Sequence, residues 1–177
     1  MPVKIALIGG GSREFGPAVI RDILLSERLC AEGAELVLMD IVPAHLKDNE
    51  AYAGRVMAKL QRRIRLSTTT SLDDALRDAA FVVVALEVDR YLYWAQDFHV
   101  PRQYGFKQVY GENGGPGGIF HALRNMGPIV QVARTMERLC PRAIMLNFSN
   151  PEHKLCEAVS RLTSIKAYGL CHGFFMG

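Results

Sequence analysis

The sequence predicts an α/β fold: a doubly wound, Rossmann-like parallel sheet of about six strands in the order 3-2-1-4-5-6. Two observations lead to this prediction. A short apolar run, 3–8, ends in three consecutive glycines and leads into a helical pattern. Beyond it, apolar β-rich segments alternate with segments of helical periodicity, as expected for parallel strands joined by right-handed crossovers. We expect residues 1–177 to form one domain.

Each predicted strand is a short run of apolar and β-branched residues. The run 81–86 is continuously apolar, as expected for a central parallel strand covered on both faces. The run 64–69 is more polar and is expected to be more exposed. The predicted strands are 3–8, 35–40, 64–69, 81–86, 143–148 and 165–170.

Helical spacing or a capping residue marks each predicted helix. Ser71 can cap a short helix, and Pro151 occupies a first-turn position where proline is tolerated. The stretch 111–118 holds five glycines and a proline and is expected to be a loop. The aromatic segment 91–110 is expected either to pack on the sheet or to line a sugar pocket. The predicted helices are about 16–30, 43–61, 71–78, 119–139 and 151–162.

Composition narrows the class of protein. The net charge of +3 in 177 residues gives no argument for nucleic-acid binding, and no apolar run approaches the roughly 18 residues that span a bilayer. The four cysteines show no C-x-x-C spacing, which favours reduced thiols in a cytoplasmic protein.

The glycine turn has the residues of a phosphate-binding loop. Gly9 would make the tight turn, and Gly11 would let a pyrophosphate approach the backbone and the free N–H groups at the helix start. Glu14 occupies the place of the usual third glycine, so its side chain is expected to turn outward. The alternative is a glycine turn without a ligand.

Asp40 ends the second predicted strand. A carboxylate there can accept hydrogen bonds from both hydroxyls of the adenosine ribose, and its charge disfavours a 2′-phosphate. No arginine stands beside it to neutralise such a phosphate. The sequence therefore favours NAD over NADP.

Several polar residues fall where ligands bind in such folds, beyond the carboxyl ends of the strands. Cys171 offers a thiolate and His172 an imidazole, and adjacent residues on an extended backbone point to opposite sides. One is therefore expected to be a ligand and the other a proton donor or substrate contact; the alternative is a buried thiol beside a capped histidine. The predicted residues at this edge are Gly9 to Ser12, Asp40, Glu87, Asn150, Cys171 and His172.

These residues and several others resemble the N-terminal part of glycoside hydrolase family 4, whose members are NAD- and metal-dependent glycosidases. The similarity spans nearly the whole chain, and the missing third glycine is normal in this family. The motifs are Gly9-x-Gly11-Ser12-x-x-Phe15, Leu38-x-Asp40, Tyr104-Gly105, Glu112, Gly115-Pro116-Gly117-Gly118-Ile119, Ala122-Leu123-Arg124, Leu146-Asn147-Phe148-Ser149-Asn150-Pro151 and Gly169-Leu170-Cys171-His172-Gly173.

The resemblance implies hydrolysis of glycosides by oxidation, elimination, addition and reduction, an exception to the two-carboxylate mechanism. NAD⁺ would take hydride from sugar C3, and a divalent metal, usually Mn²⁺, would polarise the sugar oxygens. By position, Cys171 matches the metal ligand and Asn150 the substrate-contacting asparagine. His172 matches the acid that assists the leaving group, and Glu112 the residue that tunes the base. The cofactor residues would be Gly9, Gly11, Ser12, Phe15 and Asp40.

The Cys-His-Gly form looks more like family members that act on unphosphorylated α-glycosides than like 6-phospho-glycosidases, which stay an alternative. Members of the family are much longer, so we expect this chain to be truncated before the C-terminal catalytic part, inactive alone, and a homodimer or homotetramer at full length. The metal-binding histidine and the catalytic tyrosine would lie beyond residue 177. A second alternative is a 2-hydroxyacid dehydrogenase of the lactate/malate type.

Overall fold

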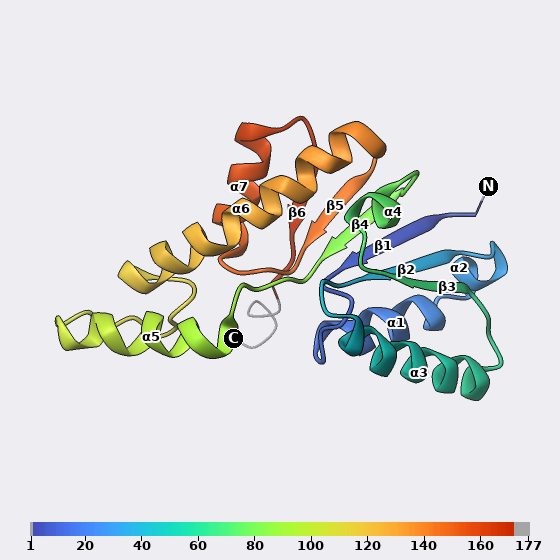
Figure 1. Ribbon diagram of the computed structural model, residues 1–177, viewed down its shortest axis with the longest axis horizontal. Coiled ribbons are helices and arrows are strands. Elements are labelled where there is room, and N and C mark those ends of the chain that lie inside the picture. Colours follow the sequence, from blue (N-terminus) through green and yellow to red (C-terminus); the bar gives the residue numbers. More distant parts are fainter. Residues whose placement is uncertain (1, 172–177) are drawn as a thin grey trace.

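A computed structural model describes residues 2–171 as a six-stranded sheet flanked by helices (Figure 1). All neighbouring strands pair in parallel, and their order is β3-β2-β1-β4-β5-β6. The predicted fold class and strand order are therefore confirmed. The strands are β1 (Lys4–Ile8), β2 (Glu35–Met39), β3 (Arg65–Thr69), β4 (Phe81–Val84), β5 (Ile144–Asn147) and β6 (Lys166–Gly169).

Helices cover both faces of the sheet, and each face has its own apolar core. On one face, α1 and α3 pack on the central strands through residues such as Ile20 and Leu46. On the other face, α4, α6 and α7 pack through residues such as Leu76, Ile129 and Leu155. The helices are α1 (Phe15–Leu25), α2 (Glu27–Ala31), α3 (Pro43–Leu60), α4 (Leu72–Leu76), α5 (Arg90–Gln103), α6 (Gly115–Leu139) and α7 (Glu152–Leu162).

The strand register aligns the loops that form the candidate site. Ile8 of β1 lies opposite Met39 of β2 and Val84 of β4, so these three strands end level with one another. Asn147, the last residue of β5, pairs with Val84 in turn. The loops after β1, β2, β4 and β5 therefore leave the sheet at one edge, its carboxyl edge.

The predicted helix 16–30 is wrong in one respect, because Ser26 divides it. The Ser26 backbone is extended, at φ −72° and ψ 106°, and its Oγ accepts a hydrogen bond from the N–H of Leu29 at 3.3 Å. Serine favours such caps because its side chain replaces the hydrogen bonds that a helix start lacks. Helices α1 and α2 result.

The predicted loop 111–118 is also partly wrong, because its second half begins α6. Pro116 takes a first-turn position, where its missing N–H costs nothing. The glycines permit close packing of α6 against α5: a Cβ on Gly117 would lie 2.0 Å from the carbonyl oxygen of Asp97. Only residues 91–103 of the aromatic segment 91–110, to which the sequence assigned no element, lie in a helix, α5.

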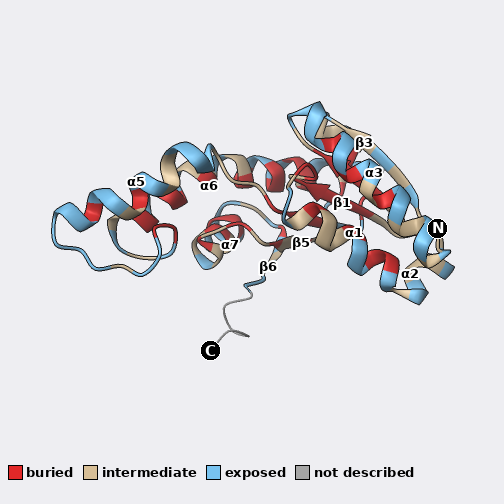
Figure 2. Ribbon diagram, turned by 90° about the horizontal axis from the view of Figure 1, so that it is seen from below, coloured by how far each residue is buried: buried red, intermediate tan, exposed pale blue. Residues whose placement is uncertain are grey.

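Helix α5 and the first half of α6 form an arm that extends away from the sheet (Figure 1). Most of α5 is exposed, in contrast to the central strands β1, β2 and β4 (Figure 2). The arm leaves the sheet after β4, so its base adjoins the carboxyl edge. Among residues 2–171, no helix is both long and apolar enough to cross a membrane.

Two helical glycines give a matched test of the packing between α1 and α3. A Cβ on Gly16 would lie 2.1 Å from Nδ2 of buried Asn49, whereas a Cβ on exposed Gly54 meets nothing within 4 Å. We expect Gly16→Ala to lower the free energy of unfolding by about 2 kcal/mol, because overpacking forces the helices apart. Gly54→Ala should raise it by up to about 1 kcal/mol through helix propensity. Urea denaturation measures both values, and equal effects would contradict this packing.

Candidate functional site

The glycine turn is built into the ends of two neighbouring strands. The N–H groups of Gly9 and Gly10 donate to the carbonyl oxygen of Met39 at 3.0 and 2.8 Å. Gly9 has a φ of +85°, and a Cβ there would lie 2.2 Å from the carbonyl oxygen of Ala85. Only glycine tolerates both conditions, so the predicted role of Gly9 in a tight turn agrees with the structure.

Asp40 is held at the end of β2 by two backbone groups. Gly11 donates its N–H to Oδ2 at 3.0 Å, and Val42 donates to Oδ1 at 3.0 Å. Each carboxylate oxygen has a second acceptor position. Asp40 is half-buried, so its carboxylate is fixed and still reachable by a pair of ribose hydroxyls.

The structure shows a second reason for glycine at position 11, which the sequence did not show. A Cβ on Gly11 would lie 2.7 Å from Asp40 Oδ2 and 2.5 Å from the Cβ of His45. The missing side chain therefore lets the backbone approach Asp40, in addition to the predicted approach of a pyrophosphate.

The expectation of free N–H groups at the start of α1 is wrong for three residues. Ser12 Oγ accepts from the N–H groups of Glu14 and Phe15 at 3.3 and 3.1 Å, and the Ser12 carbonyl accepts from Gly16 at 3.1 Å. Because Oγ is an acceptor in both bonds, the Ser12 hydroxyl proton can still be donated to an anion. The side chain of Glu14 is exposed, as predicted.

Asn49 is a residue of this turn that the sequence analysis missed. Its Nδ2 donates to the carbonyl oxygens of Gly10 and Ser12 at 2.7 and 3.0 Å, and its side chain is buried. Its signal in the sequence is faint: one amide on the apolar face of α3. Gly16 makes room for this amide, so Gly16 takes over the close packing that a third glycine usually allows.

The other side of the carboxyl edge carries Asn150 and Cys171. Asn150 is half-buried after β5, and Cys171 is exposed just beyond β6. Two residues of the predicted motif to which the sequence gave no role of their own shape this turn: Asn147 bonds the backbone of Ser149, and Ser149 Oγ accepts from the N–H of Leu86 at 3.0 Å. His172 lies outside the described residues.

Phe15 links the two sides of the edge. Its ring centroid lies 5.5 Å from that of Phe148, at the end of β5. The predicted cofactor residue Phe15 therefore packs against Phe148, which follows β5 and stands two residues before Asn150.

Glu112 lies in the arm, between α5 and α6, and its side chain is buried. Its Oε2 accepts a hydrogen bond from Trp94 Nε1 at 2.5 Å. The guanidinium of Arg90 lies 5.0 Å from the Trp94 ring centroid. Glu112 is thus anchored by the only tryptophan of the chain.

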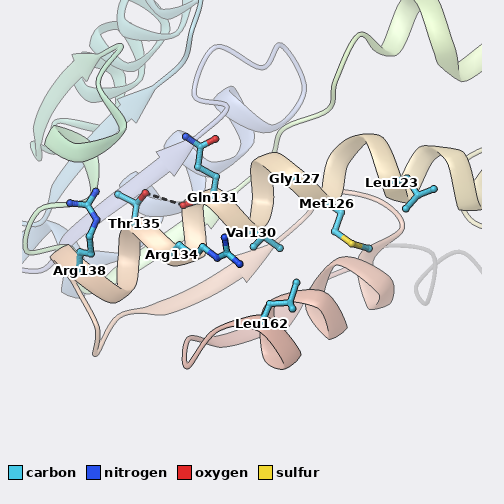
Figure 3. A pocket seen from close by; sticks show the side chains of 9 residues that line it. All are labelled: Leu123, Met126, Gly127, Val130, Gln131, Arg134, Thr135, Arg138 and Leu162. Carbon is cyan, nitrogen blue, oxygen red and sulfur yellow. Dashed lines mark hydrogen bonds between the residues drawn. The ribbon is translucent and has the colours of Figure 1, made fainter.

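Cys171, the one metal ligand that the sequence predicts within this chain, lies among the described residues and is exposed. Within residues 2–171, no three His, Cys, Asp or Glu side chains are grouped so that they could hold a metal ion. A hollow between α6 and α7 is lined by Arg134, Arg138, Leu162 and neighbouring α6 residues (Figure 3). No described residue of the predicted site lines it, so the functional interest stays at the carboxyl edge.

The Trp94–Glu112 pair yields a stability prediction. Trp94→Phe removes the indole donor from a buried carboxylate, which should lower the free energy of unfolding by about 1–3 kcal/mol. Tyr91→Phe is the control, because Tyr91 is 96% exposed and its change should stay within about 0.5 kcal/mol. Urea denaturation followed by circular dichroism compares them. Indistinguishable variants would show that the indole does not stabilise Glu112.

The cysteines should differ in their reaction with a thiol reagent. Burial raises the pKa of the Cys140 and Cys156 thiols, which lowers their thiolate fraction at pH 8, whereas Cys171 is exposed. We expect iodoacetamide to label Cys171 before Cys140 and Cys156. Peptide mass spectrometry after timed quenching gives the order. Labelling of Cys140 ahead of Cys171 would contradict the described burial.

Comparison with known proteins identifies the family. The family model "Family 4 glycosyl hydrolase" matches residues 4–176. An α-glucosidase of Erwinia rhapontici is 42% identical over 97% of this chain and 38% of its own length. The chain therefore spans about two-fifths of that relative.

Solved structures agree with this match. A putative glucosidase of Bacillus subtilis is 27% identical with a TM-score of 0.87, over 98% of this chain and 39% of that one. A 6-phospho-β-glucosidase of Thermotoga maritima, solved with manganese, NAD⁺ and glucose-6-phosphate, is 25% identical with a TM-score of 0.82, over 98% and 41%. A malate dehydrogenase of Plasmodium falciparum, at 21% identity and a TM-score of 0.69, shares the fold alone. With a family model that matches almost its full length, the chain belongs to glycosyl hydrolase family 4.

Proposed function

We propose that residues 1–177 are the dinucleotide-binding domain of an NAD- and Mn²⁺-dependent glycoside hydrolase. The observation that carries this proposal is the Asp40 carboxylate, fixed 3.0 Å from the N–H of Gly11 at the carboxyl edge. The turn fits a dinucleotide: Asp40 can accept two ribose hydroxyls, and the Ser12 hydroxyl can donate to a phosphate. Gly9, Gly11, Ser12, Phe15 and Asp40 would form this site.

NAD would supply a hydride acceptor for a carbinol of the sugar. The protein's part is to bind and orient. Asp40 would exclude NADP, because a 2′-phosphate would place a second negative charge against a carboxylate that already accepts two hydrogen bonds. The homologous Thermotoga maritima structure with NAD⁺ and manganese supports the choice of cofactors.

Three further residues are proposed to contact the substrate or the metal. The exposed thiol of Cys171 would be one metal ligand, although the described residues do not by themselves complete a metal site. Asn150 would donate and accept at the sugar hydroxyls, with His172 as the acid for the leaving group. Glu112, anchored by Trp94, would tune the base.

For the substrate we propose unphosphorylated α-glycosides. The Erwinia rhapontici relative is an α-glucosidase, and a Bacillus subtilis relative at 35% identity over 96% of this chain and 39% of its own length is an α-galactosidase. We also propose that the full-length protein is a homodimer or homotetramer, and that it is cytoplasmic, because the cysteines show no C-x-x-C spacing.

Cofactor binding tests the first part of this proposal. We expect the protein to bind NAD more tightly than NADP in isothermal titration calorimetry. Asp40→Asn should weaken NAD binding about tenfold and reduce the preference over NADP, because the amide offers one acceptor where the carboxylate offered two. Asp48→Asn, an exposed change on α3, is the control for lost charge. Equal affinity of the Asp40→Asn protein and the wild type for NAD would contradict the assignment.

Glycoside hydrolysis tests the second part. Protein purified from the native gene should release p-nitrophenol from p-nitrophenyl α-glucoside only with NAD⁺, Mn²⁺ and a reductant all present. The reductant is needed because a metal-binding thiolate oxidises readily. Hydrolysis that persists without NAD⁺ would refute the proposed mechanism. Net formation of NADH from lactate or malate would favour a dehydrogenase instead.

A further inference from the structure

Glu87 lies at the carboxyl edge and has no role in the site described above. It follows β4 by three residues, on the opposite side of β1 from Asp40. The strand order reverses between β1 and β4, which is where open α/β sheets bind ligands. Ala85, two residues earlier, places its carbonyl oxygen against Gly9. Glu87 therefore directly follows a segment, Ala85–Leu86, that packs against the glycine turn.

The carboxylate of Glu87 is held from two sides. Arg90 Nη1 donates to Oε2 at 2.5 Å, and His121 Nε2 lies 3.6 Å from Oε1. In the described part of the chain, neither Oε1 nor Nε2 has a hydrogen-bond partner, and both atoms are fully buried. Leaving two such atoms without a hydrogen bond costs free energy of folding. Their position opposite each other is therefore better explained by a function than by stability.

The ring of His121 is also held on the side away from Glu87. Its side chain is 2% exposed, and Nδ1 lies 3.0 Å from Asp97 Oδ2, which Arg124 also contacts. An imidazolium carries an N–H on each ring nitrogen and can donate to both carboxylates. The same helix, α6, fixes the main chain beside Glu87: Asn125 Oδ1 accepts from the N–H of Val88 at 2.8 Å.

The charges around Glu87 and His121 indicate what kind of ligand Glu87 could bind. Arg90 faces Glu87 and Arg124 faces Asp97, so neither guanidinium is left for a phosphate. The Glu87 side chain stays 22% exposed at the edge. A carboxylate is an acceptor, so its natural ligand here is a hydroxyl group. The hydroxyl source must lie beside the glycine turn.

We propose that Glu87 binds the ribose of the nicotinamide half of the dinucleotide through a hydroxyl-to-carboxylate hydrogen bond, and that His121, backed by Asp97, is its positioning residue. This inference rests on the proposed binding of NAD. Asp40 on one side of β1 and Glu87 on the other would then hold the two riboses of one cofactor. Its consequence is that Glu87 should matter to ligands with the second ribose and not to ligands without it.

Titration with ADP and ADP-ribose tests this consequence, because only ADP-ribose has the second ribose. Glu87→Gln should weaken ADP-ribose binding about tenfold, as expected for one charge-assisted hydrogen bond, and leave ADP binding unchanged. The control Glu50→Gln removes an exposed carboxylate on α3 and should change neither. Equal loss for both ligands, or no loss for ADP-ribose, overturns the assignment. If Glu87→Gln weakens methyl α-glucoside binding in place of ADP-ribose binding, the contact is to the substrate sugar and the ribose assignment is wrong.

His121 variants test the positioning role. His121→Phe keeps a ring without a donor and should reproduce the selective ADP-ribose loss, whereas His121→Gln keeps an N–H donor and should restore part of it. Thermal unfolding shows whether each variant is folded, and Glu87→Gln tests the contact alone if His121→Phe is not. Gln and Phe variants with the same ADP-ribose affinity would contradict positioning by a donor. A wild-type protein that binds neither ADP nor NAD overturns the proposed function itself, a result distinct from these.

Discussion

The hydrogen bond between the N–H of Gly11 and the carboxylate of Asp40 joins the two halves of the nucleotide site. It ties the turn after β1 to the end of β2, and a second backbone bond from Val42 fixes the other carboxylate oxygen. Without a side chain at position 11 the two segments can touch; with one, they cannot. The orientation of the acceptor that would meet a ribose thus depends on a single glycine.

The glycine that allows close packing beside the turn stands at a different position from that of the common fingerprint. In the common fingerprint, a third glycine lets the helix lie close to the strand. Here Glu14 stands in that place and turns to solvent, while Gly16 leaves room for the Asn49 amide, which bonds two carbonyl oxygens of the turn. The close contact moves from helix and strand to helix and helix, between α1 and α3. Hydrogen bonds from Asn49 therefore hold the turn, although the glycine fingerprint is incomplete.

Periodicity and strand composition were sufficient to predict the sheet and its strand order, because those features follow from burial of apolar faces. They were insufficient where tertiary contacts decide. Gly117 and Gly118 suggested a loop, yet both are helical, and Gly117 is needed because α5 packs too closely there for a Cβ. Ser26 divides a helix that apolar spacing alone would continue.

Side-chain partners far apart in sequence were hidden for the same reason. Nothing local links Trp94 to Glu112, or Glu87 to His121; the first pair meets because the chain between α5 and α6 returns to α5. The roles of Asn150, His172 and Cys171 came from a family resemblance. They stay predictions, and His172 lies outside the described residues.

A crystal structure of the protein with NAD would test the central claim most directly. We expect the adenosine ribose hydroxyls within about 2.7–3.2 Å of the Asp40 carboxylate, with the pyrophosphate at the turn 9–12. A dinucleotide bound away from the carboxyl edge, or an adenosine ribose that faces any residue other than Asp40, would contradict the proposed cofactor site.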